Sequence, residues 1–148
     1  MLRVTKLTDY AIVVASALAR DPSVSHRATE VARLAAVPEP TVRKVLRLLV
    51  QGGVASSTRG VKGGYRLSRL PQEIDLAQIV AAVEGPIAMT ECCTDEVDCE
   101  QESACALRPN WQMINDAIQS ALASINLEQM SAPQPLPPPL VTLRRARG

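Results

Sequence analysis

The sequence contains no Phe, one Trp and two Tyr among its 148 residues. A core with so few aromatic side chains has to be built from Leu, Val, Ile and Ala, which favours packed helices over an aromatic-rich β-sandwich. The single histidine, His26, excludes mechanisms that need two histidines in one chain, such as HExxH metalloproteases and C2H2 zinc fingers. Because His26 precedes a predicted helix, we expect it at the surface.

Long apolar runs are also missing. No run reaches the roughly 18 residues that span a bilayer, so we expect no membrane partner. Arg3 and Lys6 precede the apolar stretch 10–19 as in a signal peptide, but Asp9 and the lack of a cleavage site favour an amphipathic helix. We therefore expect a cytoplasmic protein whose four cysteines stay reduced and act as ligands or sensors.

Charge is distributed unevenly along the chain. Residues 1–70 carry 12 Lys and Arg against 4 Asp and Glu, whereas residues 71–130 carry one Arg against 11 acids. The tail, 131–148, adds three arginines. A basic first half attracts a polyanion and an acidic second half repels one, so the pattern favours a nucleic-acid-binding part joined to a sensing or assembly part.

Three short helices are predicted in the basic half. Thr8 can cap a helix that runs to about Arg20, and a second helix covers 28–35. A turn with two prolines, 37–40, leads to a third helix over 41–51. Two helices joined by so short a turn are typical of a helix-turn-helix.

The third predicted helix separates its two faces. Val42, Val45, Leu46 and Leu49 can pack inward. A recognition helix needs such a buried stripe together with long polar and cationic side chains on the other face. The candidates for DNA contact on this helix are Thr41, Arg43, Lys44 and Arg47. A solvated basic face is the alternative.

A β-hairpin is predicted directly after that helix. Strands over 54–59 and 65–67 flank a tip with three glycines and one lysine. A hairpin in this place is the wing of a winged-helix domain, and we expect Arg59, Lys62 and Arg66 to contact phosphate or enter a minor groove. A P-loop is excluded because no Gly-Lys-Ser/Thr follows.

The acidic half begins with a short helix and ends with a long one. Asp75 can cap a helix to about Val83, and Pro109 opens a helix to about Asn126. The long helix carries an apolar stripe, which favours packing against a twin helix in a homodimer over packing within one subunit. Its members are Trp111, Ile114, Ile118, Ala121, Leu122 and Ile125. The proline- and arginine-rich tail is expected to be disordered.

Three cysteines between these helices are evenly spaced. Cys93, Cys99 and Cys105 have five residues between neighbours, a spacing that cannot direct all three to one side of a helix but suits a loop around a centre. Cys92 is adjacent to Cys93, so one of the two is expected to be the primary ligand. Iron–sulfur, zinc, a thiol switch and inert cysteines all stay open, although zinc usually prefers closer CxxC pairs.

Taken together, these segments resemble the Rrf-two family of winged-helix regulators over about residues 1–130. The resemblance is carried by LTDYA (7–11), VPEPTVRKVLRLLVQGGVASSTRGVKGGYRL (37–67), LAQIVAAVEGP (76–86) and C-x5-C-x5-C (93–105). The family includes the iron–sulfur-sensing IscR and the nitric-oxide-sensing NsrR. The segments around the cysteines look most like the branch that controls the SUF iron–sulfur assembly operon.

The resemblance also implies a ligand set. Cys93, Cys99 and Cys105 match the three cluster ligands of the family. IscR-like members have a histidine three residues after the last cysteine, where this chain has Arg108. NsrR-like members use an aspartate of the partner subunit, and Asp9 occupies that place, although an acid there also complements the helix dipole. Asp9 and Cys92 are the candidates for a fourth ligand.

The expected protein is mainly α with a small β-hairpin wing. Its parts are a winged helix-turn-helix domain (1–70), a connecting helix (71–91), a cysteine-rich cluster-binding loop (92–108), a dimerisation helix (109–130) and a tail (131–148). We expect a dimeric repressor of SUF genes that binds a palindromic operator in double-stranded DNA, senses through a two-iron or four-iron cluster, and has no small-molecule substrate. A winged-helix regulator with a zinc, thiol or nitric-oxide switch and another regulon is the alternative. With no CxxC motif and no nucleotide loop, an enzyme is not expected.

Overall fold

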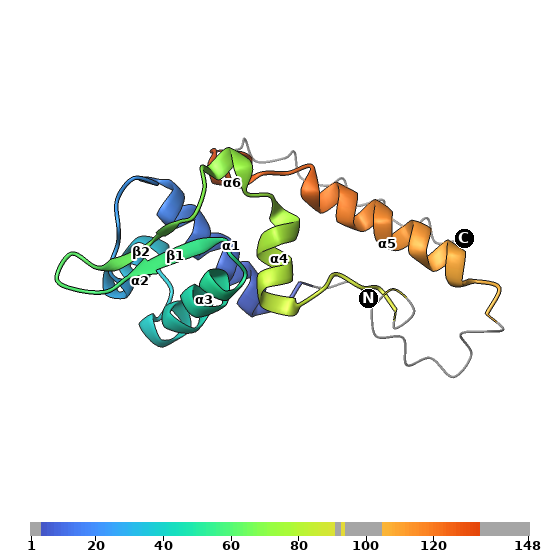
Figure 1. Ribbon diagram of the computed structural model, residues 1–148, viewed down its shortest axis with the longest axis horizontal. Coiled ribbons are helices and arrows are strands. Elements are labelled where there is room, and N and C mark those ends of the chain that lie inside the picture. Colours follow the sequence, from blue (N-terminus) through green and yellow to red (C-terminus); the bar gives the residue numbers. More distant parts are fainter. Residues whose placement is uncertain (1–3, 91–92, 94–104, 134–148) are drawn as a thin grey trace, which may run out of the picture.

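The computed structural model describes residues 4–90, 93 and 105–133. The predictions for Cys92, Cys99 and most of the tail therefore lie outside the described residues. The elements are α1 (Lys6–Ala19), α2 (Ala28–Ala35), α3 (Glu39–Gln51), β1 (Ala55–Thr58), β2 (Gly64–Leu67), a 3-10 helix η1 (Pro71–Glu73), α4 (Leu76–Glu84), α5 (Arg108–Ala123) and α6 (Leu127–Ser131). Figure 1 shows α1–α4, η1, α6 and the hairpin as one body, from which α5 extends to one side.

The core of that body is aliphatic, as the shortage of aromatics predicts. Helix α1 lies at its centre and packs against α2, α3, α4 and α6. The four inward residues predicted for α3 are completely buried, and so is Leu127 of α6. Between α2 and α3, Ala36 adopts a left-handed conformation (φ 53°), and its N–H bonds to the carbonyl of Ala32, which ends α2 and starts the turn.

The hairpin that follows α3 is a two-stranded antiparallel sheet. Ala55 pairs with Leu67 and Thr58 pairs with Gly64, so the predicted wing is confirmed as a structural element. Ala55 and Leu67 are buried against the helical body, whereas the far end of the hairpin is exposed. The fold is therefore the expected one: mainly helical, with a helix-turn-helix and a small β wing.

Two predicted helix starts are wrong. Helix α1 is capped by Thr5 and not by Thr8, because the Thr5 side chain accepts the Thr8 N–H while Thr8 itself is fully buried. Helix α3 begins at Glu39, two residues before the predicted start. Pro40 lies in its first turn, where a missing N–H and a fixed φ cost nothing.

The predicted long helix is shorter than expected and is followed by another. Helix α5 ends at Ala123, and Asn126 is the N-cap of α6, with its side chain accepting the Gln129 N–H. Hydrogen bonds of 2.8 Å from the Leu76 N–H to the Ile125 carbonyl and from the Leu127 N–H to the Ile74 carbonyl close this turn onto the body. The chain thus returns to the core after α5.

The outer surface of α5 keeps much of its apolar stripe exposed. Trp111 and Ile114 are 37% and 40% exposed, and Met113, outside the predicted stripe, is 66% exposed. Helix α5 packs against α4 within the chain. Within the described ranges, no helix combines the length and the apolarity needed to cross a membrane.

Replacing Leu46 by Ala tests the importance of the α3 stripe. Because Leu46 is completely buried, we expect the free energy of unfolding to fall by about 2–5 kcal/mol through lost apolar burial and the cavity left behind. Val61→Ala is the matched control, since Val61 is 89% exposed. Urea unfolding followed by circular dichroism measures both, and equal effects would contradict the described core.

Candidate nucleic-acid interface and cysteine site

The exposed face of α3 presents its cations to solvent. Arg43, Lys44 and Arg47 are exposed, whereas Thr41 is partly buried. Val42, Val45, Leu46 and Leu49 are anchored in the core, and they fix the axial rotation of the helix. The packing of α3 therefore decides which side chains point away from the body.

An ion pair that the sequence analysis did not anticipate holds one of these cations. Both Nε and an Nη of Arg43 donate to the same carboxylate oxygen of Glu39, at 2.9 and 2.6 Å. The two residues lie one helical turn apart at the start of α3, where Arg43 is exposed and Glu39 is partly exposed. Such surface pairs contribute about 0–1 kcal/mol to stability, so Glu39 holds the Arg43 side chain only weakly.

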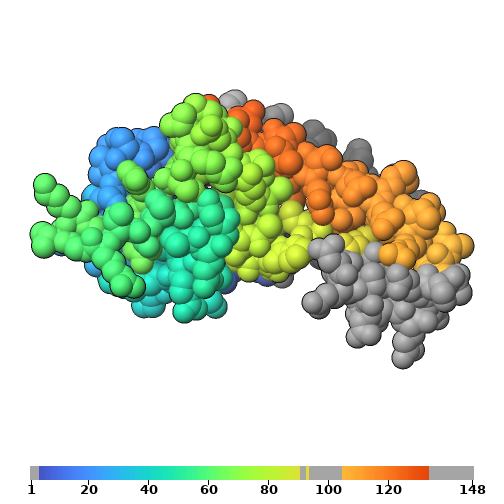
Figure 2. Space-filling view, viewed as in Figure 1, coloured from blue at the N-terminus to red at the C-terminus, as the bar shows by residue number. Residues whose placement is uncertain are grey.

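The wing adds a second group of cations beside α3. Arg59, Lys62 and Arg66 are all exposed, and Gly60 at the tip has a φ of 107°, which L side chains rarely adopt. In Figure 2 the wing protrudes at the end of the molecule next to the surface of α3. The exposed cations of α3 and those of the wing therefore lie on neighbouring parts of the surface.

Arg27 is a cation next to the wing that the sequence pattern did not predict. It precedes α2, and its guanidinium donates to the carbonyl of Val61 at the wing tip, 3.2 Å away. No local pattern could have shown this contact, because 34 residues separate its partners. Arg27 therefore connects the helix-turn-helix to the wing and adds a cation near it.

His26 is buried, which corrects the prediction of a surface residue. It is 7% exposed, and its backbone exchanges two hydrogen bonds of 2.8 Å with Tyr65 of β2. Its Nδ1 lies 3.3 Å from a carboxylate oxygen of Glu30. His26 thus forms an isolated antiparallel bridge to the outer edge of β2, which fixes the wing to the body.

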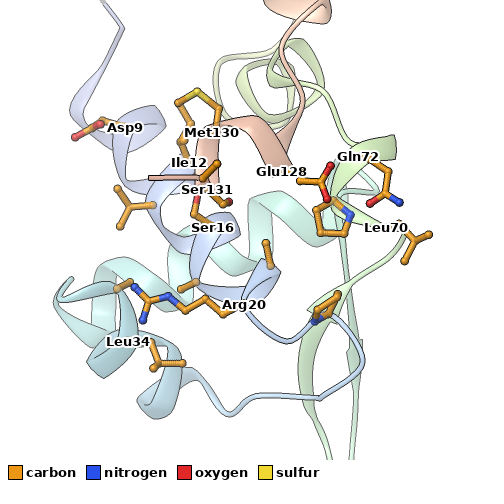
Figure 3. Close-up of a pocket in the computed structure, with 17 residues that line it drawn as sticks. Asp9, Ile12, Ser16, Arg20, Leu34, Leu70, Gln72, Glu128, Met130 and Ser131 are labelled. Atoms are coloured by element: carbon orange, nitrogen blue, oxygen red, sulfur yellow. The ribbon is translucent and has the colours of Figure 1, made fainter. Parts of the chain in front are cut away.

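Asp9 lies on the outer face of α1, at the edge of a groove. The groove has a volume of about 810 Å³ and lies between α1, the end of α2, η1 and α6. Figure 3 shows Asp9, Ile12 and Ser16 on successive turns of α1 and Arg20 at its C-terminal end, with Met130 and Ser131 of α6 beside the helix. The carboxylate of Asp9 is exposed.

The start of α1 is fastened to the end of α4 by Glu84. The hydroxyls of Thr5 and Thr8 both donate to one carboxylate oxygen of Glu84, the former at 2.6 Å. The Thr5 and Thr8 hydrogen bonds hold the pKa of Glu84 below its usual 4.5, against the opposing effect of desolvation. Glu84 therefore joins the helix that carries Asp9 to the segment that leads to Cys93.

The two described cysteines lie on either side of the undescribed segment. Cys93 and Cys105 are both partly buried free thiols. The Cys93 Sγ lies 3.4 Å from the Thr90 hydroxyl, and the Cys105 carbonyl accepts the Arg108 N–H at the start of α5. Among the described residues, no three His, Cys, Asp or Glu side chains gather as metal ligands, so Asp9 does not join Cys93 and Cys105 within one chain.

A helix-turn-helix followed by a wing, with cations on both, defines a winged-helix DNA-binding regulator. The family model for Rrf2, described as an iron-dependent transcriptional regulator, matches residues 4–133. The chain belongs to the Rrf2 family. Proteins of this family are transcriptional regulators and not enzymes, so the expectation of a non-enzymatic regulator is confirmed.

Individual relatives agree with this assignment. Protein aau3 of Rhizobium meliloti is 30% identical over 135 residues, which cover 90% of this chain and 88% of that protein. The regulator IscR of Photorhabdus laumondii is 34% identical over 82 residues, covering 55% of this chain and 49% of that protein.

Two solved structures share the fold. CymR (YrzC), the global cysteine regulator of B. subtilis, has a TM-score of 0.67 at 26% identity and covers 88% of this chain and 97% of its own. T. potens IscR has a TM-score of 0.64 at 23% identity and covers 87% of this chain and 85% of its own.

Replacing Glu84 by Gln tests the connection between α1 and α4. A carboxylate such as Glu84, whose pKa is lowered by folding, stabilises the folded protein at pH values above its pKa in the unfolded state. This stabilisation is lost as the pH falls through the pKa of the folded state. We therefore expect Glu84→Gln to lower the melting temperature at neutral pH, and the difference from the original protein to shrink as the pH falls below 4.5.

Asp116→Asn is the control for this experiment, because it removes an exposed carboxylate from α5 instead. Thermal unfolding by circular dichroism at a series of pH values measures all three proteins. If Glu84→Gln lowers the melting temperature equally at every pH, the ionised carboxylate is not what Thr5 and Thr8 stabilise.

Proposed function

We propose that this chain is a homodimeric repressor that binds palindromic double-stranded DNA in the cytoplasm. Its DNA contacts are Thr41, Arg43, Lys44 and Arg47 of α3 and Arg59, Lys62 and Arg66 of the wing. The observation that carries this proposal is the adjacency of the cationic wing to the cationic face of α3. A helix in the major groove with a wing on the neighbouring backbone uses both groups of cations at once.

The homodimer is proposed from surfaces that one chain leaves uncovered. Trp111, Met113 and Ile114 expose apolar side chains on α5, and such patches on a monomer commonly mark an interface. A two-fold dimer presents two copies of α3 to DNA, so its operator is expected to be a palindrome.

The regulatory ligand is proposed to be an iron–sulfur cluster bound by Cys93, Cys99 and Cys105. The donor set fits, because thiolates are the ligands that such clusters use and both described cysteines are unpaired and partly accessible. Asp9 of a partner subunit is the proposed fourth ligand, with Cys92 as the other candidate. A bound cluster supplies sensitivity to iron supply, oxygen or nitric oxide, while the residues of this chain fix where it is held.

The regulated genes are proposed to be those of SUF iron–sulfur assembly. This part of the proposal depends on the resemblance of the cysteine-bearing segment to that branch of the family. It is also supported by the iron-dependent description of the family and by an IscR among the relatives. The similarity to a cysteine regulator makes a thiol switch with a different regulon the second candidate.

Removing single cations of α3 tests the DNA interface. We expect Arg43→Ala and Arg47→Ala each to weaken binding to the operator by about 1–3 kcal/mol if the side chain contacts a base. Arg20→Ala is the matched control, because Arg20 is an exposed arginine that lines the groove beside α1. Fluorescence anisotropy with operator DNA at fixed salt measures the affinities, and equal affinities for all three variants would contradict the assigned face.

Metal analysis tests the proposed cluster. Protein purified without oxygen is expected to contain iron and acid-labile sulfide, and Cys93→Ser and Cys105→Ser should each lose both, because a thiolate ligand is removed. Cys92→Ser should retain them and Asp9→Asn should lower them if Asp9 is the fourth ligand. Zinc without sulfide, or no metal after reconstitution, would overturn the cluster in favour of zinc or thiol chemistry.

A further inference from the structure

The segment that leads to Cys93 has no regular secondary structure but is hydrogen-bonded to α5. The side-chain oxygen of Asn115 accepts the backbone N–H of Met89 at 3.1 Å. The side-chain amide of Gln119 donates to the carbonyl of Ile87 at 2.9 Å. Asn115 and Gln119 are four residues apart, so they lie on the same face of the helix and bind the segment at two points.

Burial distinguishes Asn115 from its neighbours on α5. It is 4% exposed and is the one residue of this helix classed as buried. A polar side chain is buried at low cost only when its hydrogen bonds are made, and here its partner is a backbone N–H without a helix or strand of its own. The hydrogen bond of Asn115 therefore fixes Met89 as the point at which this segment lies against α5.

The two hydrogen bonds also fix the approach to Cys93. The Cys93 N–H bonds to the carbonyl of Thr90, the residue after Met89, at 2.9 Å. At the other end of the cysteine segment, the Cys105 carbonyl accepts the Arg108 N–H of α5. Cys105 is thus bonded to the first residue of α5, and Cys93 is bonded to the residue that follows the Asn115-bound Met89.

We infer that Asn115 and Gln119 are positioning residues that hold Cys93 in a fixed place relative to Cys105, with α5 as the common support. The inference rests on the proposed function: if the cysteines bind the regulatory ligand, α5 is the element that senses whether they are ligated. A force that a bound ligand exerts on Cys93 reaches α5 through these two hydrogen bonds. The same helix carries the exposed apolar residues of the proposed dimer interface.

The test measures the separation of Cys93 and Cys105 in the metal-free, full-length protein. Cys92 and Cys99 are replaced by Ser, and nitroxide labels are attached to Cys93 and Cys105. We expect one narrow distance distribution by pulsed electron paramagnetic resonance. Asn115→Leu, which removes the acceptor, and Gln119→Glu, which replaces the donating amide by an acceptor, should each lose the narrow peak.

Two control variants separate positioning from general stability. Asn115→Asp keeps an oxygen that accepts the Met89 N–H and should restore the narrow peak. Gln112→Glu makes the exchange of Gln119→Glu at another exposed position of α5 and should leave the peak unchanged. A merely structural role would lower the melting temperature without changing this one distance. If Asn115→Leu does not fold, Gln119→Glu decides, because Gln119 is exposed.

A broad distribution in the protein with both residues intact, or a narrow one in folded Asn115→Leu and Gln119→Glu, would overturn the inference. The measurement needs no metal, so its outcome is independent of the cluster. If the labelled protein gives the narrow peak and the unlabelled protein contains no iron or sulfide, the positioning role stands and the proposed cluster is wrong. If the unlabelled protein binds a cluster and the distance distribution is the same in the variants, the cluster stands and the positioning role is wrong.

Discussion

The buried aliphatic stripe of α3 is the constraint on which the DNA-binding half depends. Val42, Val45, Leu46 and Leu49 are completely buried against a core centred on α1. Burial of one face of a helix determines what its other face presents, and here that face carries three exposed cations. The wing follows α3 directly and packs against the same body, so the two basic elements keep a fixed relation to each other.

Local sequence patterns predicted most of this half of the molecule. The bounds of α2, the four buried residues of α3 and the hairpin depend on periodicity, prolines and glycines within a few residues of each other. The two incorrect helix starts also concern residues only two or three positions apart in the sequence. Thr5 and Thr8 both have capping side chains, and the choice between them follows from the burial of Thr8 and its contact with Glu84.

The contacts that the sequence did not predict join residues far apart in the chain. The bond of Arg27 to Val61 spans 34 residues, and that of Thr5 to Glu84 spans 79. The burial of His26 likewise follows from its pairing with Tyr65 of β2. Patterns in a single sequence do not predict contacts between residues so far apart in the chain. For the candidate cysteine site, spacing and resemblance predicted the candidate ligands, whereas the contacts of Asn115 and Gln119 could be found only in the structure.

The return of the chain to the body after α5 has a consequence for how this family can vary. Ile74 and Leu76 bond to Leu127 and Ile125. Helix α4 still packs on α1 and α3, so the chain leaves the body only after Glu84 and re-enters it at Ile125. The entropy of closing such an excursion rises only logarithmically with its length. Insertions or deletions between the end of α4 and the last turn of α5 therefore cost the DNA-binding body little, and the length of this segment can change while α1–α4 and the wing keep their packing.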